Sequence, residues 1–166
     1  MPSLNLSQSA YDELKAHFYP KMYGIPGVDG IPGATLSKQG IIKQLVKDGN
    51  YDGYCNPEIT DENYPQTEDM QIPEYKIIPG SEIGSGWVYR KDVENKFKEL
   101  GLRLPTATEA LYIFTKSPRD KWLCAFLSGS QDAFIVNEDD DQRDLDLNTC
   151  DDYWYSHYYF VGVCCE

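Results

Sequence analysis

Apolar positions near the start of the chain recur at helical spacing in two segments. Ala10, Leu14 and Phe18 lie four residues apart, which predicts a helix over residues 7–19. A second helix is predicted over residues 37–48, ending at Gly49. The apolar face of this second helix consists of Ile41, Ile42, Leu45 and Val46.

Between these helices, glycine occupies every third position from Gly24 to Gly33 in the stretch GIPGVDGIPGAT. Collagen requires this period because only glycine fits on the axis of its triple helix. The apolar residues Ile25, Val28 and Ile31 would face water on a triple helix. We therefore predict an irregular loop whose apolar residues contact the domain or a neighbouring subunit, with a short triple helix as the alternative.

Residues 50–73 are rich in Asp, Asn, Pro and Tyr and show little periodicity. Such composition is typical of loops, because these side chains hydrogen-bond to the nearby backbone. We predict an ordered loop that wraps the domain and is held in place by Tyr51, Tyr54 and Tyr64.

From Tyr75 onward the pattern becomes that of alternating short strands and helices. Residues 75–78 predict a strand, residues 86–89 predict a strand or the start of a helix, and residues 91–100 predict a helix. Thr106 and Glu109 have the spacing of a capping box, which predicts that Thr106 begins the next helix. The buried stripe of this helix is expected to be Ala107, Ala110, Leu111 and Phe114.

The C-terminal region predicts β-structure, because aromatic and β-branched residues are abundant there. Strands are expected over residues 122–128, 133–136 and 154–165. An acidic connection, residues 137–148 with the sequence NEDDDQRDLDLN, is expected to separate the last two strands as a loop.

Composition narrows the classes of partner. The chain has 166 residues and a net charge of −12, which argues against nucleic acid and against an anionic membrane surface, since both require a basic face. No apolar stretch approaches the roughly 20 residues of a membrane span. The first residues lack the basic and apolar regions of a secretory signal, so we expect the protein in a virion or in the cytoplasm.

The segment from Arg103 to Glu109 reads R-L-P-T-x-x-E, and the chain ends in YFVGVCCE. In this order, after an amphipathic helix, these residues resemble the formylglycine-generating enzyme family and related C-type-lectin-like proteins. The resemblance implies an α+β fold in which two helices pack on a small, mostly antiparallel sheet and the terminal strand lies near the centre. It covers about the last ninety residues, so we predict an N-terminal helical arm, residues 1–74, and a C-type-lectin-like domain, residues 75–166.

The oxidising members of this family use a pair of cysteines that binds copper, and soft thiolates suit Cu(I). No two cysteines of this chain form a Cys-x-x-Cys pair, which also weakens the case for a zinc site. Adjacent residues of a strand point to opposite faces, so Cys164 and Cys165 cannot share one pocket. We therefore predict no enzymatic activity, with an oxidase that pairs another cysteine as an alternative. The five cysteines are Cys55, Cys124, Cys150, Cys164 and Cys165.

Other members of the superfamily are binding proteins, including the variable receptor-binding proteins encoded with diversity-generating retroelements. The segment DDYWYSHYY, residues 151–159, is rich in the residues that dominate binding surfaces. Alternation along a strand sends one of two sets outward: Trp154, Ser156 and Tyr158, or Asp151, Tyr153, Tyr155, His157 and Tyr159. Burial of both sets in the core is the alternative. The predicted protein- or glycan-binding residues are Asp144, Asp146, Tyr153, Tyr155, His157 and Tyr159.

The acidic connection raises the question of calcium, which takes oxygen ligands. The ligands of such a site would be Asp139, Asp141, Asp144 and Asp146. The run lacks the D-x-[DN]-x-[DN]-G pattern of a calcium loop, so we predict a solvated loop and no cofactor.

Together these observations predict a non-enzymatic binding or structural module of a viral particle, such as a fibre, tail or capsid-associated protein of a bacteriophage. Homo-oligomerisation or docking on a particle scaffold fits this role. One alternative is an acidic cytoplasmic inhibitor that occupies the basic groove of a partner protein. Another is a formylglycine-generating type of oxidase.

Overall fold

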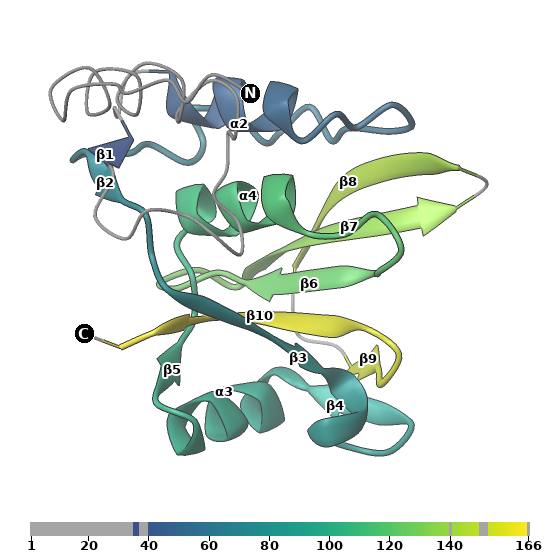
Figure 1. The fold of residues 1–166 in the computed structure, drawn as a ribbon. Helices are drawn as coiled ribbons and strands as arrows, with labels where there is room; N and C mark the ends of the chain where they lie inside the picture. Colours follow the sequence, from purple (N-terminus) through teal and green to yellow (C-terminus); the bar gives the residue numbers. More distant parts are fainter. Residues whose placement is uncertain (1–34, 37–39, 140, 150–152, 166) are drawn as a thin grey trace, which may run out of the picture.

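The structure is a computed structural model that describes residues 35–36, 40–139, 141–149 and 153–165 (Figure 1). The helix predicted over residues 7–19 lies outside the described residues, and so does the glycine tract as far as Ala34. The described residues form three α-helices, one short 3-10 helix and a set of β-strands, a mixed α/β architecture.

The centre of the fold is a six-stranded sheet with the strand order β3-β10-β6-β7-β8, in which β5 also pairs with β10. Strand β10 runs parallel to β6, and the other pairs are antiparallel. The terminal strand therefore lies between β3 and β6, near the centre of the sheet as predicted. The strands are β3 (Tyr75–Pro79), β5 (Leu102–Arg103), β6 (Leu123–Phe126), β7 (Asp132–Asp139), β8 (Gln142–Thr149) and β10 (Tyr159–Cys164).

Helices cover both faces of this sheet (Figure 1). Helices α2 (Ile41–Asp48) and α4 (Ala107–Lys116) pack on one face. Helix α3 (Arg90–Glu99) covers the other face, next to a separate two-stranded sheet of β4 (Trp87–Tyr89) and β9 (Tyr153–Tyr155). The remaining elements are β1 (Thr35–Leu36), which pairs with β2 (Met70–Gln71), and the 3-10 helix η1 (Gly80–Glu82).

Alternation along the central strands divides their side chains between two cores. On β7, Phe134 and Val136 join the core under α4, whereas Ala133 and Ile135 join the core under α3. A side chain at Gly162 of β10 would place its Cβ 2.9 Å from Cε2 of Phe97. Glycine at this position is therefore what allows α3 to lie close against the sheet.

The R-L-P-T-x-x-E segment is one hydrogen-bonded unit that begins α4. The Thr106 hydroxyl accepts from the Glu109 backbone N–H (3.3 Å), and the Glu109 carboxylate accepts from the Thr106 backbone N–H (2.8 Å). Arg103 donates to both carboxylate oxygens of Glu109, each at 2.8 Å. The predicted N-cap is confirmed, and the position of Val161 in a strand is confirmed as well.

Part of the segment predicted as an arm contributes to the same cores. Ile41, Ile42, Leu45, Ile59 and Met70 pack in one cluster with residues of α4 and the central sheet. The boundary between residues 74 and 75 stays a prediction, but residues 41–72 share a hydrophobic core with the region that follows.

The loop of residues 50–73 has ordered contacts, as predicted, but only two of its three tyrosines act as anchors. Tyr51 and Tyr64 pack against the core under α4. The Tyr64 ring meets Phe134 edge-on at 4.9 Å, and its hydroxyl donates to Asp132. The prediction for Tyr54 was wrong, since its side chain is 50% exposed while only its backbone bonds to the sheet.

The prediction of an acidic loop was also wrong: residues 137–139 form the end of β7, and residues 142–148 form most of β8. The two strands pair in register from Asp132↔Thr149 to Asp139↔Gln142. Arg143 and Leu145 are buried and alternate with the half-buried Asp144 and Asp146, so the segment has the two-residue period of a strand. Cross-strand pairing and burial outweigh the low β-propensity of Asp here.

The C-terminal strand predicted over residues 154–165 is in fact two strands. A turn separates β9 from β10, and within it the Tyr158 N–H donates to the Tyr155 carbonyl at 3.1 Å. Gly80 donates to the Tyr158 carbonyl at 2.7 Å, and its missing side chain leaves room for this contact. The turn therefore moves β9 out of the central sheet and into the small sheet with β4.

Candidate functional site

Four large aromatic side chains project from the small sheet of β4 and β9 and form what we call the aromatic surface: Trp87, Tyr89, Tyr153 and Tyr155. They occupy two cross-strand pairs, Trp87↔Tyr155 and Tyr89↔Tyr153. Their exposed fractions are 47%, 52%, 52% and 52%, respectively. Large rings that stay half exposed in a cluster mark interaction sites on many proteins.

The pleat of the small sheet explains why these rings face outward. Val88 and Trp154 alternate with them and pair across the strands. Both point inward, where Val88 is fully buried and Trp154 is 7% exposed against Phe126 and Tyr158. The inner face therefore anchors the sheet to the core under α3, and the outer face is left to solvent.

The exposed rings touch one another. Trp87 lies 4.2 Å from Tyr153 at an interplanar angle of 71°, and 4.7 Å from Tyr155 at 36°, measured between ring centroids. Tyr89 meets Tyr153 at 6.4 Å. Such contacts restrict the rotamers of the rings, so a partner that binds them loses less conformational entropy than it would with isolated side chains.

The surface continues along the chain through His157. Its imidazole stacks on Tyr155 at 5.3 Å and 18° and on Tyr158 at 5.0 Å and 27°, and it meets Trp122 at 5.2 Å. Tyr159, which follows in β10, does not continue this surface: it is half-buried against the core under α4, with the Lys121 ammonium 4.5 Å from its ring centroid. The outward set of the two predicted sets is thus the one with Tyr153, Tyr155 and His157; Asp151 lies outside the described residues.

Trp87 and Tyr89 were missed as site residues. The signal was present in the sequence, because the triplet Trp87-Val88-Tyr89 has the alternation of a half-buried strand. It could not show that this strand pairs with residues 153–155, more than sixty positions further along the chain.

Asp144 and Asp146, the predicted polar rim, lie on β8 of the central sheet. Asp144 accepts a hydrogen bond from the Tyr54 backbone N–H. Asp146 accepts from the Asn56 side chain (3.0 Å) and from the Leu147 backbone N–H (2.8 Å). Both carboxylates therefore hold the loop of residues 50–73 against the sheet edge, and their role in ligand binding stays a prediction.

The structure lends no geometric support to a calcium site. Among the described residues, no group of three or more His, Cys, Asp and Glu side chains is placed to hold a metal ion. Asp139 pairs with Gln142 in the β7–β8 hairpin, and Asp141 occupies its turn with a left-handed φ of 66°. Calcium binding by Asp139, Asp141, Asp144 and Asp146 stays an untested alternative.

The described cysteines occupy different environments. Cys124 is fully buried in the core under α3, where the half-buried Cys164 also packs, and Cys165 is exposed. The backbone of Cys55 forms an isolated parallel β-bridge with that of Leu145 at the sheet edge. Burial raises the pKa of the Cys55 thiol. The positions of these described cysteines add no support for a copper-dependent oxidase, which stays an alternative hypothesis.

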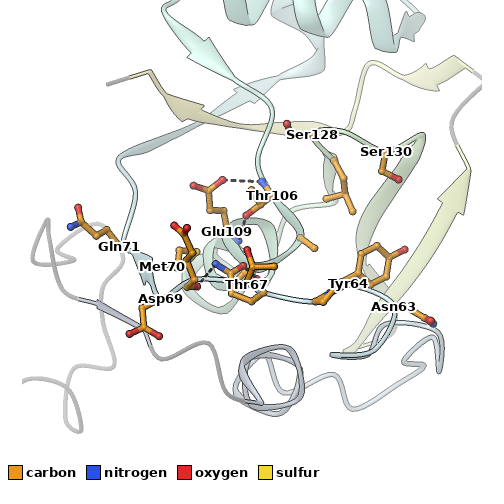
Figure 2. Close-up of a pocket in the computed structure, with 16 residues that line it drawn as sticks. Asn63, Tyr64, Thr67, Asp69, Met70, Gln71, Thr106, Glu109, Ser128 and Ser130 are labelled. Carbon is orange, nitrogen blue, oxygen red and sulfur yellow. Dashed lines mark hydrogen bonds between the residues drawn. The ribbon is translucent and has the colours of Figure 1, made fainter.

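A hollow with a volume of about 770 Å³ lies between the loop of residues 63–71 and the start of α4 (Figure 2). Ser128 and Ser130 close one side of it. The Thr108 hydroxyl donates to the Gln66 amide oxygen at 2.7 Å inside this hollow. The Glu109 carboxylate on its wall is buried, which by itself raises its pKa, but the bonds from Arg103 and Thr106 bring the net pKa below its usual value. The hydrogen bonds of this carboxylate thus hold the start of α4 in place.

Comparison with known proteins yields no match: no family model matches the sequence, and neither a curated protein nor a solved structure is significantly similar to it. The resemblance to C-type-lectin-like proteins thus rests on the residues quoted above. Within the described residues, no helix is long and apolar enough to cross a membrane.

Proposed function

We propose that this chain is a non-enzymatic binding module with a C-type-lectin-like fold, and that its ligand docks on the aromatic surface. The observation that carries the proposal is the block of four half-exposed rings on the small sheet, Trp87, Tyr89, Tyr153 and Tyr155. Rings with this exposure bury a large area at low cost in side-chain entropy when a partner covers them.

The C-type-lectin-like assignment is supported by three features together. The R-L-P-T-x-x-E segment begins a helix, the terminal strand lies inside the sheet, and helices cover both faces. The wider role that we propose is a structural or binding component of a viral particle, which presents this surface to a protein or a glycan. An identification of capsid or tail genes beside its gene would support that role.

Two double variants test the binding surface. Tyr153→Ala with Tyr155→Ala removes half of the exposed rings, and we expect the fold to be retained while ligand binding is lost. Trp154→Ala with Tyr158→Ala is the matched control, because these side chains are 7% and 8% exposed. Truncation of a buried aromatic residue costs about 3–5 kcal/mol, so the control should be strongly destabilised or unfolded.

Binding is measured on immobilised neutral oligosaccharides and on immobilised basic peptides, and folding by circular dichroism and thermal melting. Loss of capture by a folded Tyr153/Tyr155 variant supports the proposal. If no probe distinguishes the folded variant from the parent chain, the aromatic surface is not the binding site. If both double variants only lose stability, the rings are part of the core and the proposal also fails.

A specific observation favours one second candidate. The chain carries 27 acidic and 15 basic residues, which suits an inhibitor that occupies a basic groove through long-range attraction. Such an inhibitor would bind basic proteins in a salt-sensitive way, and its binding would not depend on the exposed rings.

A further inference from the structure

The faces of the exposed rings define what chemistry the aromatic surface can take. The π-face of Trp or Tyr carries partial negative charge, and a cation within about 6 Å of the ring centre is attracted to it. Trp87 and its three tyrosine neighbours are each about half exposed, so ring area remains open after their mutual contacts. The surface is therefore suited to cationic groups as well as to apolar ones.

Cations already lie on two aromatic rings of the chain outside this surface. The Lys121 ammonium lies 4.5 Å from the centre of the Tyr159 ring, beyond His157. Arg90, which directly follows Tyr89, places its guanidinium 5.6 Å from the centre of the Phe126 ring. Phe126 is buried in the core under α3 and Tyr159 packs against the core under α4, so both contacts show that ring faces of this fold hold cations, although neither ring belongs to the aromatic surface.

The net charge of the whole chain also favours a cationic partner. The excess of 12 negative charges attracts a cationic partner over long range and repels nucleic acids and acidic glycans. The nearby guanidinium of Arg90 does not counter this attraction. It is bound by Glu94 (2.9 Å) and by the carbonyls of Ser130 (2.8 Å) and Leu127 (3.0 Å).

We propose that the partner of the aromatic surface is a basic protein segment whose arginine side chains lie over the rings of Trp87, Tyr89, Tyr153 and Tyr155. This inference deepens the proposed function and rests on it. Arginine suits the site better than lysine, because its planar guanidinium stacks on aromatic faces and is more weakly hydrated than an ammonium group. A neutral glycan is the competing occupant and is an outcome of the test.

The experiment uses the whole chain and two flexible probes of glycine and serine, one with several arginines and one with the same number of lysines. Tryptophan fluorescence reports binding, since Trp87 is half exposed whereas Trp154 is buried. We expect the arginine probe to bind more tightly than the lysine probe. We also expect its affinity to fall as salt is added, because the attraction is partly electrostatic.

The Tyr153→Ala/Tyr155→Ala variant should bind the arginine probe about tenfold more weakly than the parent chain, because two exposed cation–ring contacts are lost. Tyr54→Ala is the matched control: this tyrosine is 50% exposed on the loop of residues 50–73, so its removal changes exposed ring area without touching the aromatic surface. The control should bind the arginine probe as the parent chain does.

Two results overturn the inference. The first is that the arginine probe does not bind the parent chain. The second is that the arginine probe binds the parent chain and the double variant with equal affinity, because net charge alone would then account for its binding. The proposed function survives either result if neutral oligosaccharides bind in a manner that depends on Tyr153 and Tyr155. It fails together with the inference if the double substitution changes the binding of no probe of either kind.

Discussion

Replacement of Arg143 by methionine is expected to destabilise the fold more than any single surface substitution. The Arg143 side chain is 4% exposed and lies 3.2 Å from the Glu138 carboxylate, which is 12% exposed. Its guanidinium donates to the Phe114 carbonyl at 2.8 Å, near the end of α4, and to the Gly49 carbonyl at 3.5 Å, just after α2. It also lies 5.4 Å from the Tyr51 ring. One side chain from β8 thus joins the C-terminal ends of two helices.

The magnitude follows from what methionine leaves behind. A hydrogen bond from a charged donor contributes about 1.5–3 kcal/mol, and removal of one partner of a buried ion pair costs about 3–5 kcal/mol. These contributions overlap, so we expect a total loss of about 3–5 kcal/mol. Burial already raises the pKa of Glu138, while Arg143 and Arg119 oppose this shift. Without Arg143 the carboxylate becomes costlier to keep charged.

Urea unfolding followed by tryptophan fluorescence measures this loss as a shift of the midpoint at constant slope. Arg119→Met is the matched control, because Arg119 also contacts Glu138, at 3.6 Å, but is 42% exposed. A partly exposed pair contributes about 0–1 kcal/mol, so the control should lose little. Equal losses in the two variants, or a loss below about 1 kcal/mol in Arg143→Met, would refute the view that the buried guanidinium holds the helix ends.

Two further predictions concern the segment that begins α4 and the contact of α3 with the sheet. The folded-state pKa of Glu109 lies below its ordinary value of 4.5, so its contribution to stability is complete above that value and is lost as the pH falls through the folded-state pKa. Glu109→Gln should therefore reduce the fall in urea stability between about pH 6 and about pH 3, and an unchanged pH profile would contradict this. Gly162→Ala should lower stability by about 1–3 kcal/mol in thermal unfolding, because its Cβ would meet the Phe97 ring at 2.9 Å; a melting temperature equal to that of the parent chain would show that α3 shifts freely.

The helices of the described region followed from the sequence, because their determinants lie within a few positions of one another. The periodic apolar residues of α2 and α3, and the Thr106–Glu109 capping box of α4, act over one or two turns. Alternation around residue 154 likewise separated Trp154 from the outward-facing Tyr153 and Tyr155 before any pairing was known.

Strand β8 shows where local reasoning failed. Its three charged positions suggested a solvated loop, because the burial of Arg143 depends on carbonyls from distant parts of the chain, at Gly49 and Phe114, and on the cross-strand carboxylate of Glu138. The same holds for Asp144 and Asp146, whose partners at Tyr54 and Asn56 are 90 positions away. A charged residue has no local signature of burial when its counter-charges come from other elements.

The sequence by itself determined that the last third of the chain is aromatic and strand-forming, and that the protein is strongly acidic. Only the tertiary structure decided which aromatic residues meet. The turn of residues 156–158 separates β9 from the central sheet, and antiparallel pairing with β4 places Trp87 and Tyr89 against Tyr155 and Tyr153. The physical reason is that strand pairing joins residues far apart in the chain, so their partners are selected by the packing of the whole fold rather than by neighbouring positions.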